Sequence, residues 1–286
     1  MQKKFKVSAA VALMLIAAAS LFALPQVPVV LSQGAPDFYF TRLVYRQNPN
    51  GGRRRGGGGR STMAPPDIPF RCPEFGGGNF FPVQGFGWAT DYPGGDCKFM
   101  GSIHRLTGIG VHPDPNVRQI LDDEIFKYPF VYAVEVGGML IEGKEVEQLR
   151  EYLLRGGFLH VDDYWGPDEF DNFHEMISRV FPEYKLERLP LSHPIFHTFF
   201  DIDQIVQVPN RNTGCRDDGR GWEDDRDRDP GVFGVKDENG RLMVVATYNS
   251  DLGDAWEYMD YPCYPAKFSG FAYRMGLNIM IYAMTH

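Results

Sequence analysis

Apolar and polar positions repeat with a helical period in two stretches near the middle of the chain. Residues 141–155 carry apolar side chains at every third or fourth position, with charged side chains largely on the opposite face. Residues 168–181 repeat this pattern, and a proline directly after them ends the helix. Short apolar runs at residues 130–136 and 158–161 precede the two predicted helices, as is typical of strands that helices cover on both sides.

The order of the predicted elements indicates the class of fold. Two strand–helix alternations in succession favour a parallel sheet with right-handed crossovers. The second half of the chain is richer in strands, and its last helix is apolar nearly all round, so it should pack against the sheet. Further strand candidates are residues 37–45, 117–121, 185–189, 204–208, 232–235 and 242–247, and further helix candidates are residues 95–106 and 270–284. We expect one α/β domain over residues 35–286, a three-layer sandwich with a mainly parallel central sheet.

Residues 1–34 have the pattern of a secretory signal. A positively charged start is followed by an apolar run over residues 7–24, and small residues ahead of Ala35 suit cleavage there. The charged start consists of Lys3, Lys4 and Lys6. The apolar run over residues 7–24 is nearly as long as the stretch of about 20 residues that spans a bilayer. An uncleaved inner-membrane anchor is therefore the alternative. Both interpretations predict export, to the periplasm or the cell exterior, with membrane contact only through an uncleaved segment.

Charge and cysteine content narrow the classes of function. The chain has 37 acidic and 29 basic residues and a formal net charge of −8, which argues against a general nucleic-acid binder. Four cysteines in an exported chain predict disulfides, for which three connectivities exist. The spacing favours Cys72–Cys97 and Cys215–Cys263. No C-x-x-C pair occurs, so a zinc site is disfavoured.

Two segments have the composition of solvent-exposed loops. Residues 47–60 are rich in glycine and arginine and cannot bury apolar surface. Residues 215–230 mix acidic side chains with arginines, and Asp225, Asp227 and Asp229 alternate as in calcium-binding loops. The sixth position of that pattern is a proline and the twelfth a lysine, so it is not an EF-hand. We expect a self-neutralising loop, with a divalent metal such as calcium on the three aspartates as the alternative.

Two adjacent carboxylates, Asp162 and Asp163, come directly after the predicted strand at residues 158–161. Ligands of open α/β sheets bind at the carboxyl ends of the strands, where carboxylates can bind a metal or act as an acid–base pair. Neighbouring side chains of an extended chain point to opposite faces, so only one of the two can face a given cleft. The alternative is that one carboxylate caps the next turn or helix. Trp165 suits either stacking on a ligand ring or packing in the core.

Further candidates lie in loops that would meet this strand end. His193 is the best-placed imidazole for proton transfer near an aspartate, and a structural role is its alternative. With His197 it has the spacing of a two-histidine metal site, but Pro194 disfavours a helix there. The expected cleft is formed by Asp162, Asp163, His193, Asp251 and Trp256. The catalytic candidates are Asp162, Asp163 and His193, and the ligand-binding candidates are Asp163, Trp165, Asp251 and Trp256.

A succession of short motifs resembles one bacterial family. The motifs are Tyr128-Pro129-Phe130, Leu149-Arg150-Glu151-Tyr152-Leu153, Gly156-Gly157-Phe158, Asp162-Asp163, His193-Pro194-Ile195-Phe196, Gly240-Arg241-Leu242, Asn249-Ser250-Asp251 and Arg274-Met275-Gly276-Leu277-Asn278. Together they resemble the domain of unknown function 4159 over roughly residues 37–286. The resemblance implies a flavodoxin-like fold close to class I glutamine-amidotransferase-like domains, and it implies no known activity. The arginine–glycine loop and the acidic loop depart from a typical member.

Three functions are compatible with these patterns. The favoured hypothesis is a non-catalytic binding or assembly module, because no nucleophile–base pair or metal motif is recognisable. The second is a hydrolase-like enzyme with an acidic strand-end cleft that takes a metal or a carbohydrate. The third is a structural subunit of an extracellular assembly. Expected partners are other exported or membrane proteins or further copies of the chain, and no nucleic acid.

Overall fold

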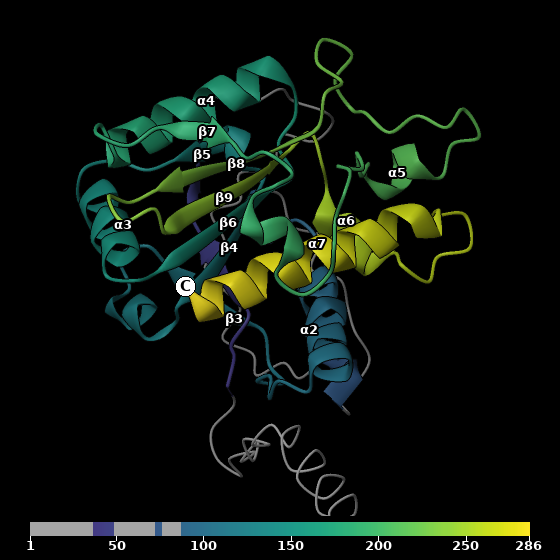
Figure 1. The fold of residues 1–286 in the computed structure, drawn as a ribbon, viewed down its shortest axis with the longest axis horizontal. Coiled ribbons are helices and arrows are strands. Elements are labelled where there is room, and N and C mark those ends of the chain that lie inside the picture. The colour runs from purple at the N-terminus through teal and green to yellow at the C-terminus, as the bar shows by residue number, and fades with distance from the viewer. Residues whose placement is uncertain (1–36, 49–71, 76–86) are drawn as a thin grey trace, which may run out of the picture. The chain divides into compact units, whose positions relative to one another are not determined.

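A seven-stranded sheet forms the centre of the protein (Figure 1). The structure is a computed structural model that describes residues 37–48, 72–75 and 87–286. In spatial order the strands are β3 (Asn116–Gln119), β1 (Thr41–Val44), β4 (Phe130–Val134), β6 (Phe158–Asp162), β9 (Leu242–Tyr248), β8 (Gly231–Lys236) and β7 (Leu186–Arg188). The first five are parallel to one another, and β8 and β7 are antiparallel additions at one edge. The mainly parallel sheet is therefore confirmed.

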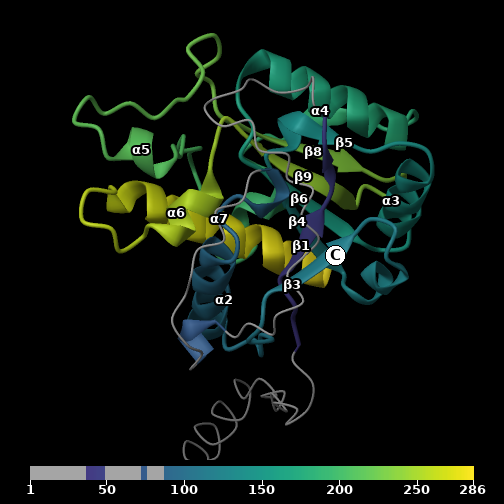
Figure 2. The same cartoon turned by 180° about the vertical axis from the view of Figure 1, so that it is seen from behind.

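Helices cover both faces of this sheet, which confirms the three layers (Figures 1 and 2). One face carries α3 (Lys144–Leu154) and α4 (Gly166–Val180), and the other carries α2 (Gly94–Thr107), α6 (Leu252–Glu257) and α7 (Ala266–Thr285). Alternate side chains of β4 enter the two apolar cores, as period-two geometry requires. Phe130 and Tyr132 lie in the core under α7, and Val131 and Ala133 lie in the core under α3 and α4.

Short elements connect the layers. The small sheet pairs β2 (Arg46–Gln47) with β5 (Met139–Leu140) in antiparallel fashion. The remaining helical turns are η1 (Pro73–Phe75), η2 (Gly87–Ala89), η3 (Asp123–Lys127), η4 (Val136–Gly138), η5 (Pro194–His197) and α5 (Arg211–Gly214). Residues 204–208, predicted as a strand, form none, which corrects that prediction. The carbonyl of Val208 instead accepts a 2.8 Å hydrogen bond from the amide of Asp251, in the loop after β9.

A buried ion pair joins strand β1 to helix α2. Arg42 on β1 and Asp96 on α2 are both completely buried and form a two-pronged pair. The same guanidinium donates hydrogen bonds to the carbonyls of Trp88, at 3.2 Å, and Thr90, at 2.6 Å. Because an unpaired buried charge is costly, this network holds the segment ahead of α2 in one position. That segment contains Asp91, which belongs to the site described below.

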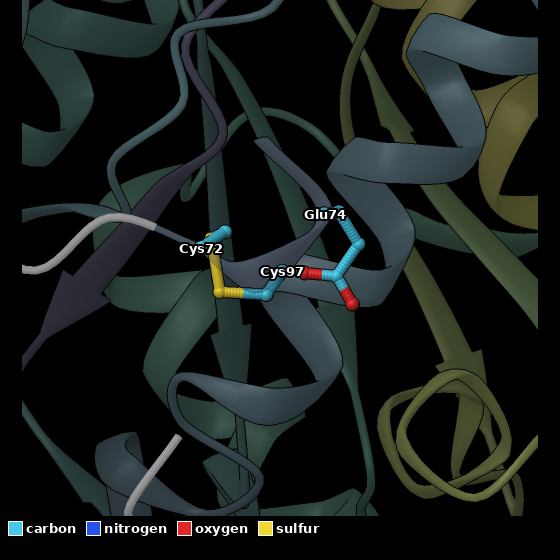
Figure 3. A group of neighbouring side chains, drawn as sticks. All are labelled: Cys72, Glu74 and Cys97. Atoms are coloured by element: carbon cyan, nitrogen blue, oxygen red, sulfur yellow. A yellow bond between two sulfur atoms is a disulfide. The ribbon is translucent and has the colours of Figure 1, made fainter. Parts of the chain in front are cut away.

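Two disulfides are present, and both are the predicted pairs. Cys72 bonds to Cys97 and Cys215 bonds to Cys263. Figure 3 shows the first pair with the neighbouring carboxylate of Glu74. These three residues lie as close together as metal ligands do, but both sulfurs are already bonded to each other. Disulfides indicate an oxidising compartment, extracellular or periplasmic.

The expected signal or anchor at residues 1–34 lies outside the described residues, as does most of the loop at 47–60. Within the described part of the chain, no helix combines the length and the apolar character that crossing a bilayer requires.

Removing the second disulfide should lower stability by a predictable amount. A cross-link between residues 48 positions apart restricts the unfolded chain and contributes about 4 kcal/mol. The double variant Cys215→Ser/Cys263→Ser should lose about 3–4 kcal/mol of unfolding free energy, measured by urea denaturation. Wild-type protein kept under a reducing agent is the control and should lose at least as much. Unchanged urea midpoints in both samples would show that the cross-link contributes nothing.

Candidate functional site

The three central strands end at the same edge of the sheet, and each is followed by a polar residue in the left-handed conformation. Glu135 follows β4 with φ 55°, Asp163 follows β6 with φ 53°, and Asn249 follows β9 with φ 52°. Asp91, ahead of α2, has φ 59° and completes the set of non-glycine residues with positive φ in the described ranges. Such a conformation costs about 1–3 kcal/mol per residue and is concentrated at functional sites in proteins. The carboxyl ends of these strands therefore have the strained backbone that is typical of functional sites.

Asp162, the last residue of β6, is buried and accepts four hydrogen bonds. Tyr132 of β4 donates to Oδ2 at 2.9 Å, and Thr247 of β9 donates to Oδ1 at 2.6 Å. The amides of Leu252 and Gly253, at the start of α6, donate to Oδ2 at 2.8 and 3.1 Å. The alternative drawn from the sequence was that one aspartate caps the next turn or helix along the chain. Asp162 instead caps α6, which lies about 90 residues further on.

Burial raises the pKa of Asp162 to about 6, against the opposing effect of its four hydrogen bonds. On the other side of Thr247, the Nε2 atom of His160 lies 3.4 Å from the threonine oxygen. Burial lowers the pKa of His160 to about 3, so its ring is neutral. Asp162 is thus fully engaged with protein donors and serves to join the strands rather than to contact a ligand.

Asp163 follows Asp162 at the same strand end and lies buried beside other acids. Its Oδ1 accepts a 2.8 Å hydrogen bond from the indole of Trp165. Burial, then the charge of Glu135, raise its pKa well above the usual range. Asp251 caps the amide of Asp254 at 2.8 Å, and burial and the charge of Asp163 raise its pKa in the same way. Glu135 itself has a pKa raised to about 8 by burial and then by neighbouring glutamates.

A second group of acids lies between α2 and α6. Carboxylate oxygens of Asp91, Asp254 and Glu257 all lie within 4.8 Å of one another. Burial, followed by the charges of the other two acids, raises the pKa of Asp91 well above its ordinary value. Burial and the charge of Asp254 raise the pKa of Glu257 to about 7. We call Asp91, Glu135, Asp163, Asp251, Asp254 and Glu257 together the acidic edge.

Two of the residues expected in the cleft lie elsewhere. His193 caps η5, where its Nδ1 accepts the amide of Ile195, and its ring packs 6.1 Å from that of Tyr282. Tyr282 also contacts Phe158, the first residue of β6. His193 therefore lies near the amino-terminal end of β6, whereas Asp162 lies at its carboxyl end. Burial, then the charge of a nearby lysine, lower its pKa. The contacts of His193 therefore place it at the opposite end of β6 from Asp162 and Asp163.

The tryptophan candidates are also packed into the protein. Trp256 is completely buried and stacks on Phe99 with ring centroids 4.1 Å apart, so it is a core residue and corrects the expectation of a ligand-stacking ring. Trp165 is buried as well and holds Asp163 through its indole nitrogen. Of the expected cleft, the structure brings together Asp162, Asp163 and Asp251.

The three aspartates of the acidic loop do not converge on a common point. Asp225 accepts hydrogen bonds from the side chains of Arg220 and Trp222, at 2.7 and 2.8 Å. The carboxylate of Asp227 accepts from Tyr248 at 2.8 Å, and that of Asp229 pairs with Arg188. Their partners lie on different elements, so the alternating pattern builds a self-neutralising loop and corrects the calcium alternative at these residues.

The acidic edge includes residues that the sequence did not single out. Glu135 follows a predicted strand directly and could have been found by the same reasoning as Asp162. Asp91 and Glu257 carry no such signal, because nothing in the local pattern shows that α2 and α6 pack side by side. Their proximity depends on the tertiary fold.

A family model described as a domain of unknown function matches residues 82–284. The chain belongs to the DUF4159 family. The matched region includes every residue of the acidic edge, so the site belongs to the DUF4159 domain itself. The family predicted from the sequence is confirmed, and the family description assigns no function. The flavodoxin-like, glutamine-amidotransferase-like fold that the resemblance implied stays a prediction. No curated protein matches the chain.

Replacing Asp162 should destabilise this DUF4159 domain strongly. Asp162→Ala leaves two hydroxyls and two amides without their acceptor in a buried site, which costs about 3–5 kcal/mol. Asp162→Asn keeps the shape and one acceptor oxygen and should cost less, about 1–3 kcal/mol. Urea denaturation measures both losses. Equal stability of the alanine variant and the wild type would show that the carboxylate does not hold the strand ends together.

The raised pKa values predict that stability falls as pH rises. Glu257 and Glu135 bind protons more tightly in the folded than in the unfolded protein, so their contribution is lost as pH passes about 7 and about 8. Unfolding free energy should therefore decrease from about pH 4.5, the ordinary pKa of a glutamate, to about pH 8, and level off above it.

Variants separate this effect from general alkaline destabilisation. The double variant Glu135→Gln/Glu257→Gln should show a flatter dependence on pH, whereas Glu238→Gln, in an exposed turn, should keep the wild-type slope. Stability that rises with pH in wild-type protein would contradict the electrostatic account.

Proposed function

We propose that this domain is an exported, non-catalytic binding module whose acidic edge binds a positively charged ligand. One observation supports this proposal above the others: Asp91, Asp163, Asp251 and Glu257 come from the segment before α2, the end of β6 and α6, and burial and then a neighbouring acid raise the pKa of each. Burying like charges together is unfavourable unless protons or a cation neutralise them. A cationic ligand would relieve this repulsion and so gain affinity.

The basic side chains whose charges reach the edge already have other partners. Arg42 is paired with Asp96. Lys98 donates to the carboxylate of Asp260 and to the carbonyl of Glu257. The guanidinium of Arg211 lies over an aromatic ring. The cationic groups named here do not outweigh burial, since the pKa values of Asp91, Asp254 and Glu257 stay raised, and a cationic ligand would take the place of the protons.

The strongest catalytic arrangement of the described residues is closed to substrate. Thr247, His160 and Asp162 form a line of hydrogen-bonding groups in which a hydroxyl lies between an imidazole and a carboxylate. All three side chains are buried, at most 2% exposed. The threonine hydroxyl donates a hydrogen bond to Asp162, and burial lowers the pKa of His160 to about 3. These properties favour a structural network over an activated nucleophile.

The hydrolase hypothesis draws on the position of Asp163. A residue with positive φ between a strand and a helix occupies the place that nucleophiles take in sharp strand-to-helix turns. However, Asp163 is held by the indole of Trp165, and burial raises its pKa, so that its neutral form is favoured. A protonated carboxyl is a poor nucleophile, whereas a cation that displaces the proton would gain the carboxylate as a partner.

A thermal-shift panel tests the proposal. At pH 8, the full chain should be stabilised by at least one of four cationic ligands: Ca²⁺, Mg²⁺, spermidine or an arginine-rich peptide. At about 100 times the dissociation constant, ligand binding contributes about 2.7 kcal/mol, which raises Tm by about 5–10 °C for a domain of this size.

Two variants show where the ligand acts. The double variant Asp163→Asn/Asp251→Asn should lose most of this shift, because both carboxylates belong to the acidic edge. Asp203→Asn, an exposed aspartate outside the edge, should keep it. The proposal fails if none of the four cations raises Tm, or if the double variant responds as the wild type does.

A further inference from the structure

Two tyrosine rings just after α6 form a corner that holds a guanidinium of the chain itself. The rings of Tyr258 and Tyr261 have centroids 5.8 Å apart and stand at 81° to each other. The guanidinium carbon of Arg211, the first residue of α5, lies 4.8 Å from the centroid of Tyr258 and 5.6 Å from that of Tyr261. Both distances lie within the range of about 6 Å over which an aromatic face attracts a cation. We call these two rings the tyrosine corner.

The tyrosine corner adjoins two carboxylates of the acidic edge. Glu257 directly precedes Tyr258 along the chain. The backbone amide of Arg211 donates a 2.5 Å hydrogen bond to Oδ2 of Asp254, so α5 lies against α6 at this point (Figure 1). Burial raises the pKa of Asp254, and the amide and then the charge of Arg211 oppose that rise. A cation in the corner therefore acts electrostatically on the acids beside it.

The side chain of Arg211 is held in the corner by weak contacts. Within the described residues, its guanidinium forms no ion pair, and its one hydrogen bond is to Oδ1 of Asn212 at 3.1 Å. The remaining contacts are the two ring faces, and an exposed cation–π contact contributes little. This contrasts with Arg42, whose guanidinium is completely buried and paired with a carboxylate. Arg211 can therefore leave the corner at low cost.

The tyrosine corner is open to solvent and adjoins apolar surface. Tyr261 is 46% exposed, and Met259 between the two tyrosines is 45% exposed. Tyrosine, methionine and arginine are the residue types enriched in protein–protein interfaces. The disulfide between Cys215, directly after α5, and Cys263, just beyond Tyr261, joins the segment with the cation to the segment with the rings. This cross-link keeps Arg211 beside the corner, as a tethered ligand is kept near its site.

We propose that the tyrosine corner binds an arginine side chain of a partner polypeptide, and that Arg211 occupies this site until the partner displaces it. This inference rests on the proposed function and names the chemical class of the cationic ligand. A guanidinium stacks on aromatic rings and is more weakly hydrated than an ammonium group, so the rings favour arginine over lysine. The carboxylates of Asp254 and Glu257 add attraction for either cation.

Arg211 lowers the affinity for the partner in this account. A ligand can enter the corner only in the fraction of molecules in which Arg211 has left it, and its apparent affinity is reduced by that fraction. Removing the guanidinium of Arg211 should therefore strengthen binding. A contact that served only to stabilise the fold would have no such effect.

Two fluorescein-labelled peptides test this inference on the full chain at pH 8. They carry four arginines or four lysines in an otherwise identical glycine–serine sequence, and fluorescence anisotropy measures their affinity. The wild type should bind the arginine peptide about threefold more tightly or better. Arg211→Gln should tighten binding of the arginine peptide about fivefold. Arg216→Gln removes the same charge from an exposed arginine nearby and should change binding less than about twofold.

Variants of the rings separate stacking from charge. Tyr258→Leu/Tyr261→Leu keeps apolar side chains but removes both aromatic faces, so it should bind the two peptides equally. Tyr258→Phe/Tyr261→Phe keeps both faces and should keep the preference for arginine. Circular dichroism and Tm check that each variant is folded.

Three results would overturn the inference. They are an Arg211→Gln variant that binds the arginine peptide no more tightly than the wild type, a leucine variant that still prefers arginine, and a wild type that binds neither peptide at millimolar concentration. If the inference fails while Ca²⁺, Mg²⁺ or spermidine still raises Tm, the proposed function stands alone. If no cation raises Tm, both fail.

Discussion

The side chain of Asp162 joins three strands and a helix at the carboxyl edge of the sheet. Its two oxygens accept hydrogen bonds from β4, β9 and the first turn of α6. Because the charge is buried, it is stable only while these donors stay in place. The strand ends and α6 are thereby fixed relative to one another, and the positions of the neighbouring acids depend on this arrangement. Asp162 is the structural centre of the site without contacting its proposed ligand.

Drawing the strand ends together has an electrostatic consequence. Glu135 and Asp163 leave their strands in left-handed conformations, and α6 brings Asp254 and Glu257 against the segment before α2. The acids are then close and buried, so their pKa values rise. The edge favours partners that supply positive charge, whether protons or a cation. In this account the fold creates a ligand site by concentrating negative charge.

The sequence predicted the architecture better than the site. The helices and strands around Asp162 were recognisable because their apolar periods are strong and glycines mark their ends. Both disulfides followed from spacing. The sequence does not show at which end of the strands His193 lies. A loop can return to either end, and local patterns do not indicate which one. Tryptophan is a residue type that often contacts ligands, yet Trp256 is buried in the core, where its ring stacks on Phe99. Asp91 became visible only through the packing of α2 on α6.

Buried carboxylates at the strand ends repel one another and retain protons near neutral pH. Carbon-13 NMR of the glutamate carboxyl groups, followed from pH 3 to 10 without divalent cations, measures this directly. Burial and neighbouring acids should give Glu257 a pKa of about 7 and Glu135 a pKa of about 8. Ordinary values near 4.3 for both would contradict the account, because the acidic edge would then be solvated and would hold no unfavourable charge for a cation to relieve.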